Sequence, residues 1–296
     1  MSGLVKCVFI LGAALAASGN KLGSDDVVFH LFTRENPQLS QPLLPIPGSI
    51  MNSNFLPERK TIITIHSSGE GVTGNFNAFI VPAHLGAHDI NLLAVDWSRG
   101  SGLYTQGLSN AVDCGRHIAF FINLLSSSFN YAPSNIRIVG VGLGGHIAGI
   151  TAERVNGVIP HIVAIDPSFH GWTHHPDILK PGQASVVEVL HTTAGSLGYD
   201  YPLGDLDFYP NGGSNQPSCG ADVSCSHILG YVFYAESIST VGGSKFVGTA
   251  CASYENAIAQ TCSGEKGVVF GGLGDKTGQS GIYTFQTNWQ QPFAQG

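Results

Sequence analysis

Three glycines, at alternate positions, separate an apolar run from a helix-like segment near the middle of the chain. Residues 136–139 predict a short buried strand, and residues 145–154 predict the helix after it. Gly140, Gly142 and Gly144 lie between them. Glycines at such a junction permit strained backbone angles and let the strand and helix approach closely. The segment therefore predicts a sharp strand-to-helix turn, which requires a helix packed on a sheet.

This turn matches the nucleophile elbow, G-x-S-x-G, except at its central residue. The elbow normally presents a serine that attacks an ester, but here Gly142 stands in its place. Because glycine has no side chain, no acyl-enzyme can form at this residue. A lone G-x-G-x-G match is weak in a chain with 39 glycines among 296 residues, so the interpretation depends on residues farther along the chain.

Two polar residues follow the turn in the chain order of a catalytic triad. Asp166 lies directly after the apolar run 162–165, the expected place for a triad acid at the end of a strand. His227 closes the segment Cys-Ser-His at 225–227. The order Gly142, Asp166, His227 matches the Ser, Asp, His order of α/β-hydrolases.

Further segments extend this pattern over most of the chain. Residues 62–66 and 91–97 predict two more strand ends of the same sheet, and Asp-Phe-Tyr-Pro-Asn-Gly-Gly occupies 207–213. Together these segments resemble the animal pancreatic-lipase family, which includes insect lipases, short-lid A1-type phospholipases and lipase-like yolk proteins. The resemblance covers roughly residue 25 to the C-terminus. It implies an α/β-hydrolase fold over residues 19–296, without the C-terminal β-sandwich domain of vertebrate pancreatic lipases.

Alternating apolar and helical stretches independently predict a mainly parallel sheet with helices on both faces. Strands are expected near 27–32, 61–65, 90–95, 136–140, 161–165 and 186–191, and helices near 75–84, 107–126 and 144–156. Ligands bind such sheets beyond the carboxyl ends of the strands. We therefore expect His66, Gly142, Asp166 and His227 to converge there.

The resemblance assigns Asp166 as the orienting acid and His227 as the base. Without a serine, we expect them to persist as a buried hydrogen-bonded pair and not to catalyse. Removing one partner would leave the other buried without its hydrogen bond. The family's oxyanion donors come from the loop after His66 and from the N–H of Leu143.

The oxyanion loop also departs from the family, which carries His-Gly and then a bulky residue. Here Ser67 and Ser68 come after His66. A serine restricts the backbone where glycine allowed close approach, and losing one oxyanion donor costs about 10²–10³ in turnover. Ser67, Ser68 or Ser226 could supply a displaced nucleophile, although a serine on the oxyanion loop would occupy the hole that it needs.

Clustered histidines at His170, His174 and His175, with Asp177, raise a metal site as one interpretation. We expect instead an exposed loop with no metal, and no cofactor anywhere in the chain. Phe169 and Trp172 in this loop could contact an apolar ligand or a membrane edge, or could simply pack.

The six cysteines are informative about the cellular compartment of the protein and about the lid loop over the active site. Residues 1–18 predict a secretory signal peptide, with Lys6, an apolar run from 7 to 15 and small residues at 16–18. Its removal takes Cys7 away. By resemblance, Cys219–Cys225 closes the lid and Cys251–Cys262 a C-terminal loop, which leaves Cys114 without a partner in the chain. We expect it to be a buried free thiol, and the alternative is an intermolecular disulfide. Five residues between Cys219 and Cys225 make a short lid, which in the family accompanies phospholipase activity and implies an open site.

The composition limits the classes of partner that the protein could bind. Charged residues make up 11% of the chain and the net charge is −7, which argues against nucleic acid, and no segment is apolar for long enough to span a bilayer. We expect a secreted, non-catalytic protein that serves as a yolk or storage protein or binds a lipid or fatty-acyl ligand. The alternatives are a lipase or A1-type phospholipase with residual or displaced activity, and a lipid binder of the digestive tract. The oligomeric state stays open.

Overall fold

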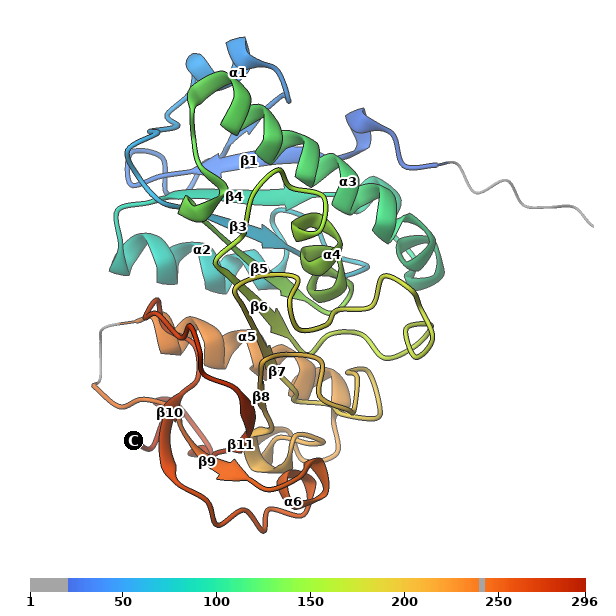
Figure 1. Cartoon of the computed structure of the whole chain (residues 1–296), viewed down its shortest axis with the longest axis vertical. Coiled ribbons are helices and arrows are strands. Elements are labelled where there is room, and N and C mark those ends of the chain that lie inside the picture. The colour runs from blue at the N-terminus through green and yellow to red at the C-terminus, as the bar shows by residue number, and fades with distance from the viewer. Residues whose placement is uncertain (1–20, 240–242) are drawn as a thin grey trace, which may run out of the picture.

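The computed structural model describes residues 21–239 and 243–296 and contains one sheet of eleven strands (Figure 1). The predicted signal peptide lies outside the described residues. The strands are β1 (Val28–Phe32), β2 (Gln41–Leu43), β3 (Thr61–Ile65), β4 (Asn91–Asp96), β5 (Ile136–Val141), β6 (His161–Ile165), β7 (Val186–Leu190), β8 (Leu206–Phe208), β9 (Val247–Cys251), β10 (Lys266–Val269) and β11 (Gly281–Thr284). Their order across the sheet is β10-β9-β11-β8-β7-β6-β5-β3-β4-β1-β2.

The middle of the sheet is parallel and its two edges are antiparallel. Strands β4, β3, β5, β6, β7, β8 and β11 pair in parallel, whereas β1, β2, β9 and β10 join antiparallel. β3 and β6 are buried along their whole length, because apolar runs without alternation suit strands covered on both faces. The predicted α/β-hydrolase fold is confirmed.

Helices cover both faces of this sheet. They are α1 (Pro47–Met51), α2 (Asn75–Ala87), α3 (Tyr104–Phe129), α4 (Leu143–Ala152), α5 (Val223–Ile238) and α6 (Tyr254–Ile258). α3 and α4 pack together on one face, and α2 and α5 pack together on the other (Figure 1). Each pair encloses its own hydrophobic core against the sheet. Within the part of the chain that is described, no helix is long and apolar enough to cross a bilayer.

The predicted elements are present, with shifted ends and several omissions. All six expected strands and all three expected helices form. The helix expected at 107–126 is longer at both ends, and the one expected at 144–156 stops at Ala152, after which residues 153–154 form a turn and 155–157 a bend. The sequence patterns did not predict β2, β8 to β11, α1, α5 or α6. Of these, α5 matters most because it carries His227.

β11 is the last strand in the sequence and yet lies inside the sheet. It pairs in parallel with β8 on one side and antiparallel with β9 on the other. The antiparallel strands β9 and β10 therefore join the rest of the sheet through residues 281–284.

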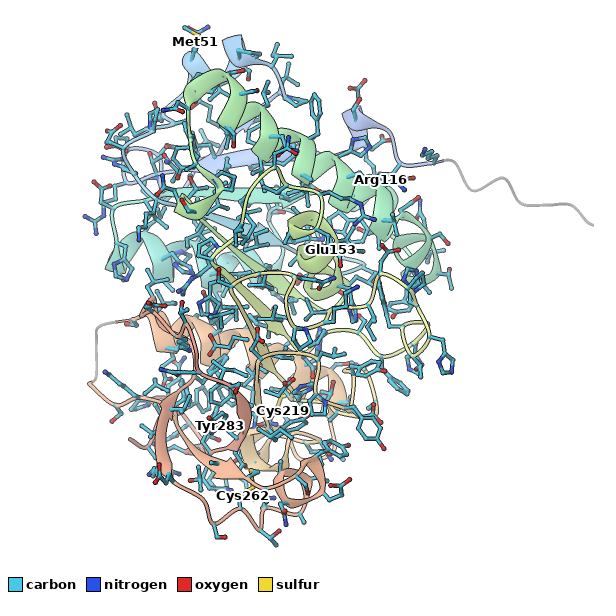
Figure 2. All side chains as sticks on the ribbon, in the orientation of Figure 1. Met51, Arg116, Glu153, Cys219, Cys262 and Tyr283 are labelled. Atoms are coloured by element: carbon cyan, nitrogen blue, oxygen red, sulfur yellow. A yellow bond between two sulfur atoms is a disulfide. The ribbon has the colours of Figure 1, made fainter. Side chains whose placement is uncertain are left out.

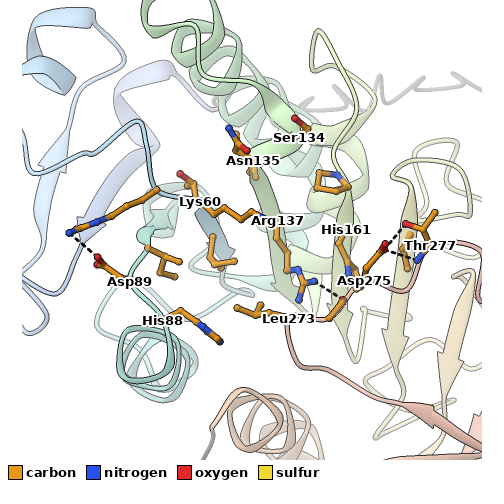
Figure 3. Close-up of a pocket in the computed structure, with 18 of the residues that line it drawn as sticks. Lys60, His88, Asp89, Ser134, Asn135, Arg137, His161, Leu273, Asp275 and Thr277 are labelled. Carbon is orange, nitrogen blue, oxygen red and sulfur yellow. Dashed lines mark hydrogen bonds and ion pairs between the residues drawn. The ribbon is translucent and has the colours of Figure 1, made fainter.

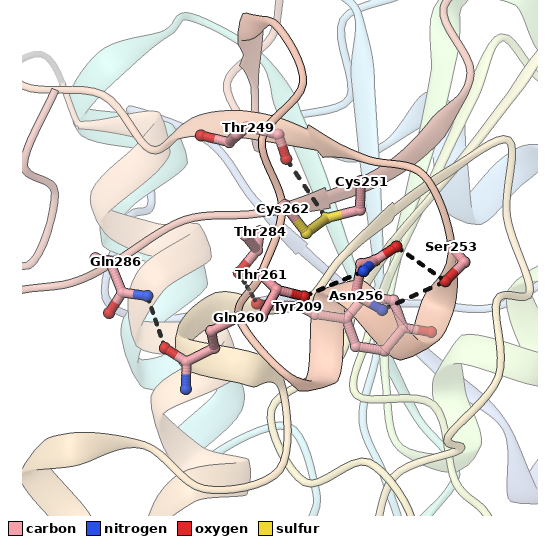
Figure 4. Close-up of a disulfide and its surroundings, with 10 residues drawn as sticks. All are labelled: Tyr209, Thr249, Cys251, Ser253, Asn256, Gln260, Thr261, Cys262, Thr284 and Gln286. Atoms are coloured by element: carbon pink, nitrogen blue, oxygen red, sulfur yellow. Dashed lines mark hydrogen bonds between the residues drawn. A yellow bond between two sulfur atoms is a disulfide. The ribbon is translucent and has the colours of Figure 1, made fainter.

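The structure forms both disulfides that the resemblance implies. Cys219 and Cys262 lie in the half of the molecule opposite Met51 (Figure 2). Cys251–Cys262 closes a loop that contains α6, whose first turn is capped by Ser253 (Figure 4). Cys114 is a free, buried thiol in α3, and burial raises its pKa well above the ordinary value.

Candidate active site

The elbow at Gly142 keeps the backbone of a nucleophile turn. Gly142 lies between β5 and α4 with φ +56° and ψ −118°, a conformation that strains any residue with a side chain. A Cβ at Gly140 would lie 2.1 Å from the carbonyl oxygen of Gly144, and one at Gly144 would lie 2.1 Å from that of Ile65. The flanking glycines are therefore required for the close approach of strand and helix.

Asp166 and His227 are in direct contact at the carboxyl ends of the strands. Asp166 comes directly after β6 and is fully buried, and His227 lies on the first turns of α5. Asp166 Oδ2 accepts a hydrogen bond from His227 Nδ1 at 2.6 Å and another from the Thr193 hydroxyl. Its Oδ1 accepts from the N–H groups of Thr192 and Thr193 at 2.8 and 2.9 Å. His227 is thus held in one orientation.

These donors keep Asp166 ionised. Burial alone would raise the pKa of its carboxyl, but the His227 imidazole and the Thr192–Thr193 donors outweigh burial and lower that pKa. Gly198 completes the enclosure, because a Cβ there would lie 2.1 Å from Asp166 Oδ1.

Ser67 fills the space beside Gly142. Its Oγ accepts a hydrogen bond from the N–H of Leu143 at 3.3 Å, and it lies 2.3 Å from the place where a Cβ of residue 142 would stand. The Ser67 hydroxyl thus occupies the space that the absence of a side chain at residue 142 would otherwise leave above the elbow.

The oxyanion loop differs from that of the family in the side chain of Ser67, not in its backbone. Ser67 is not among the described non-glycine residues with a positive φ, so the expected backbone restriction is not what sets it apart. Among the described residues, the N–H of Ser68 has no hydrogen-bond partner. One predicted oxyanion donor is thus free, whereas the Leu143 N–H is occupied by Ser67.

His66 holds this loop from its buried side, and its side chain does not line the crevice. It is fully buried, and its Nδ1 donates to the carbonyl of Ser67 at 2.7 Å. Its Nε2 accepts from the N–H of Trp97 at 3.2 Å. His66 therefore lies at the carboxyl end of β3, as expected, but its side chain is buried and does not line the crevice.

A crevice of about 430 Å³ opens above the elbow. Of the candidate residues from the sequence, Ser67, Ser68, His170 and His227 line it. Its apolar lining comes from Tyr104, Val141, Leu197, Ile228 and Tyr231. Leu197 and Ile228 are 40% and 37% exposed, so apolar surface continues from the lining to the outside.

The histidine-bearing loop serves mainly to pack. Trp172 is fully buried and stacks on His146 with ring centroids 3.9 Å apart, so it does not reach a ligand or a membrane. His175 lies against Trp172, and Asp177 pairs with Arg154 at 3.0 Å. Across residues 21–239 and 243–296, no group of three or more His, Cys, Asp or Glu is placed to hold a metal ion.

Several residues of the site went unnoticed in the sequence. Ser168 and Tyr231 line the crevice, and Thr192 and Thr193 hold Asp166. The polar run His191, Thr192 and Thr193 after the buried strand β7 was the available signal for the threonines. Ser168 and Tyr231 left no comparable signal, because nothing local distinguishes them.

A second, larger cleft of about 820 Å³ lies at the amino ends of the strands (Figure 3). Its charged groups are largely paired within the chain. Arg59 contacts Asp89 at 3.0 Å, Arg137 donates to the carbonyl of Gly272, and Asp275 accepts from Thr277. Beside it, the buried Glu188 accepts hydrogen bonds from His161 and Lys276. This end of the sheet is therefore held together by polar contacts.

Comparison with known proteins shows that the sequence of this chain matches lipases. The lipase family model matches residues 10–293. The pancreatic triacylglycerol lipase of Sus scrofa is 33% identical over 264 residues, which cover 80% of this chain and 58% of that protein. That of Homo sapiens is 33% identical over 261 residues, covering 79% and 56%. The chain thus spans less than two thirds of the length of these relatives.

The solved structures that resemble this chain are less similar to it in sequence than these lipases are. An acetyl xylan esterase from Aspergillus awamori has a TM-score of 0.37 at 10% identity, covering 50% of this chain and 67% of that one. A lipase-esterase related protein from Clostridium acetobutylicum has a TM-score of 0.30 at 19% identity, covering 42% and 48%.

Proposed function

The chain belongs to the pancreatic-lipase family, and we propose that it is a secreted, catalytically inactive member that binds lipid. The observation that carries the proposal is at the elbow, where glycine stands at the nucleophile position and the Ser67 hydroxyl occupies the adjacent space. A serine hydrolase needs a nucleophile beside its base and free oxyanion donors. The described site offers His227 and Asp166 with glycine at the nucleophile position, and Ser67 engages one of the two predicted oxyanion donors, the Leu143 N–H.

The crevice supports lipid binding as the remaining activity. An apolar concave site with a few polar groups is the usual form of a small-ligand site. The crevice above Gly142 combines apolar side chains with polar groups, including Glu70 and His170, and it continues into the exposed side chains of Leu197 and Ile228. A yolk or storage role, which the resemblance also implies, needs only abundance and digestibility and gives no reason for such a crevice.

Secretion is supported by the two disulfides, which persist in oxidising compartments. The alternative function is a lipase or A1-type phospholipase with residual activity or with a displaced nucleophile. Ser67 is the best-placed hydroxyl for that alternative, but it makes no hydrogen bond to His227 within the described residues.

A fluorophosphonate probe tests the loss of catalysis. The purified chain should remain unlabelled by intact mass under conditions where porcine pancreatic lipase is labelled fully. Neither triglyceride nor phospholipid should be hydrolysed above background. Stoichiometric labelling of the wild-type chain, at Ser67 or any other serine, would refute the proposal.

Lipid binding is tested by titration with a fluorescent fatty acid. Ile228→Glu places a charge in the apolar lining and should weaken binding at least tenfold. Val158→Glu changes an exposed apolar residue that does not line the crevice and should leave binding unchanged. Equal affinities for both variants, or no binding by the wild type, would favour the storage role.

A further inference from the structure

Residue 142 and Ser67 compete for the same space. A Cβ at residue 142 would stand 2.3 Å from Ser67 Oγ and 2.9 Å from Ser67 Cβ. Both separations are shorter than real Cβ atoms tolerate. The next neighbour, Ser168 Oγ, would be 3.4 Å away, which is ordinary contact. Ser67 is therefore the neighbour that excludes a side chain at residue 142.

Rotating the Ser67 side chain does not remove this conflict. Rotation moves Oγ but leaves Cβ in place, and the position of Cβ is set by the backbone. That backbone is held by the hydrogen bond from His66 Nδ1 to the Ser67 carbonyl, and by that from Gly69 N–H to the Ser101 carbonyl. His66 is itself fixed by two hydrogen bonds from Trp97, one to its Nε2 and one to its carbonyl.

Ser67 also occupies a donor that the chemistry would need. The N–H of Leu143 points at Ser67 Oγ and is one of the two predicted oxyanion donors. A serine placed at residue 142 would thus meet a steric conflict and a hole with one donor already engaged. Losing one oxyanion donor costs about 10²–10³ in turnover.

We infer that Ser67 is a second, independent block on catalysis, which limits the activity that a serine at residue 142 could restore. This inference rests on the proposed loss of catalysis and explains why that loss would not be fully reversed by one substitution. Removing the Ser67 side chain deletes both close contacts and frees the Leu143 N–H. The two substitutions S67G and G142S together should then make the site reactive.

The test is a cycle of four proteins in the full chain: wild type, S67G, G142S and the double variant S67G/G142S. Labelling by a fluorophosphonate probe is the chemical readout. In this reaction the introduced hydroxyl forms an O–P bond, the P–F bond breaks with loss of fluoride, and the hydroxyl proton passes to His227 Nε2. Peptide mass spectrometry locates the labelled residue.

We expect no labelling of the wild type or S67G, slow labelling of G142S, and labelling of the double variant about 100-fold faster than that of G142S. S134G/G142S is the matched control. Ser134 is an exposed serine at the opposite end of the sheet, so this variant should label like G142S.

The melting temperature gives a readout that does not depend on activity. G142S should lower Tm in both backgrounds, because residue 142 keeps its strained φ. The decrease should be smaller by roughly 2–4 °C when Ser67 is already glycine. Equal labelling rates of G142S and the double variant, or a folded double variant that stays unreactive, would overturn the inference. Labelling of the wild type would instead overturn the proposed function.

Discussion

His227 Nδ1 lies 2.6 Å from Asp166 Oδ2, although 61 residues separate them in sequence and no serine completes a triad. The contact has a structural reason. Asp166 is fully buried and ionised, and a buried charge needs donors whether or not it serves catalysis. We therefore attribute the persistence of the pair to stability.

Replacing Asp166 should cost more stability than replacing His227. Asp166→Ala leaves the Thr192 and Thr193 N–H groups and the Thr193 hydroxyl unpaired, and should lower the free energy of unfolding by about 3 kcal/mol or more. His227→Ala leaves Asp166 with three other hydrogen bonds and should cost about 1–2 kcal/mol. Urea denaturation measures both. Asp25→Ala, at an exposed acid, is the control and should stay within about 0.5 kcal/mol of wild type.

The buried ion pair of Lys276 and Glu188 gives a second prediction. Glu188 lies in β7 with no exposed surface, and its remaining hydrogen bonds come from His161 and from the N–H of Gly271. Lys276→Met should cost about 3–5 kcal/mol, because the Glu188 charge would lose its buried partner. Lys266→Met removes an exposed lysine and should have little effect. An unchanged unfolding midpoint for Lys276→Met would contradict the prediction.

Acid should destabilise the protein partly through Glu188. Burial opposes its ionisation, but Lys276 and His161 outweigh burial and lower its pKa from 4.5 to about 2. A carboxyl whose folded pKa is depressed contributes its full stability above the unfolded pKa and loses it as pH falls towards the folded value. The loss from this group should therefore develop between about pH 4.5 and pH 2.

Glu188→Gln isolates this contribution. The variant should be less stable than wild type at neutral pH, yet its unfolding free energy should fall less between about pH 7 and pH 3. Urea titrations at the two pH values give the comparison. A fall as large as that of wild type would show that Glu188 does not contribute to the acid sensitivity.

Removing either disulfide should destabilise the fold by a similar, moderate amount. The bonded cysteines are separated by 6 positions in Cys219–Cys225 and by 11 in Cys251–Cys262. Closure entropy grows only with the logarithm of loop length, so paired serine replacements should each cost about 2–3 kcal/mol. Thermal unfolding of the two double variants checks this. A cost near zero for either would mean that the unfolded chain is not restrained by that bond.

The sequence was sufficient for the central sheet because its strands are local signals. β3, β5 and β6 are apolar runs with little alternation, and their ends carry the polar residues of the site. α5 was missed because its residues from Ile228 to Ala235 are apolar almost without interruption, so the helical period is hidden. β8 and β11 are short and depend on partners distant in sequence.

The position of the Ser67 side chain could be foreseen only in part. The sequence indicates that a serine on this loop would occupy the oxyanion hole. It does not indicate that the hydroxyl reaches the space beside Gly142, because that contact joins residues 75 positions apart. The anchoring of the loop by the buried His66 and Trp97 is equally non-local.

The location of β11 has a consequence for the order in which the molecule can be assembled on the ribosome. β9 and β10 are synthesised before β11, yet only β11 connects them to β8. Until residues 281–284 have left the exit tunnel, β8 and β9 each present an unpaired edge, and such edges invite wrong partners. The N-terminal strands can pair during synthesis, whereas this part of the sheet closes only after β11 has emerged.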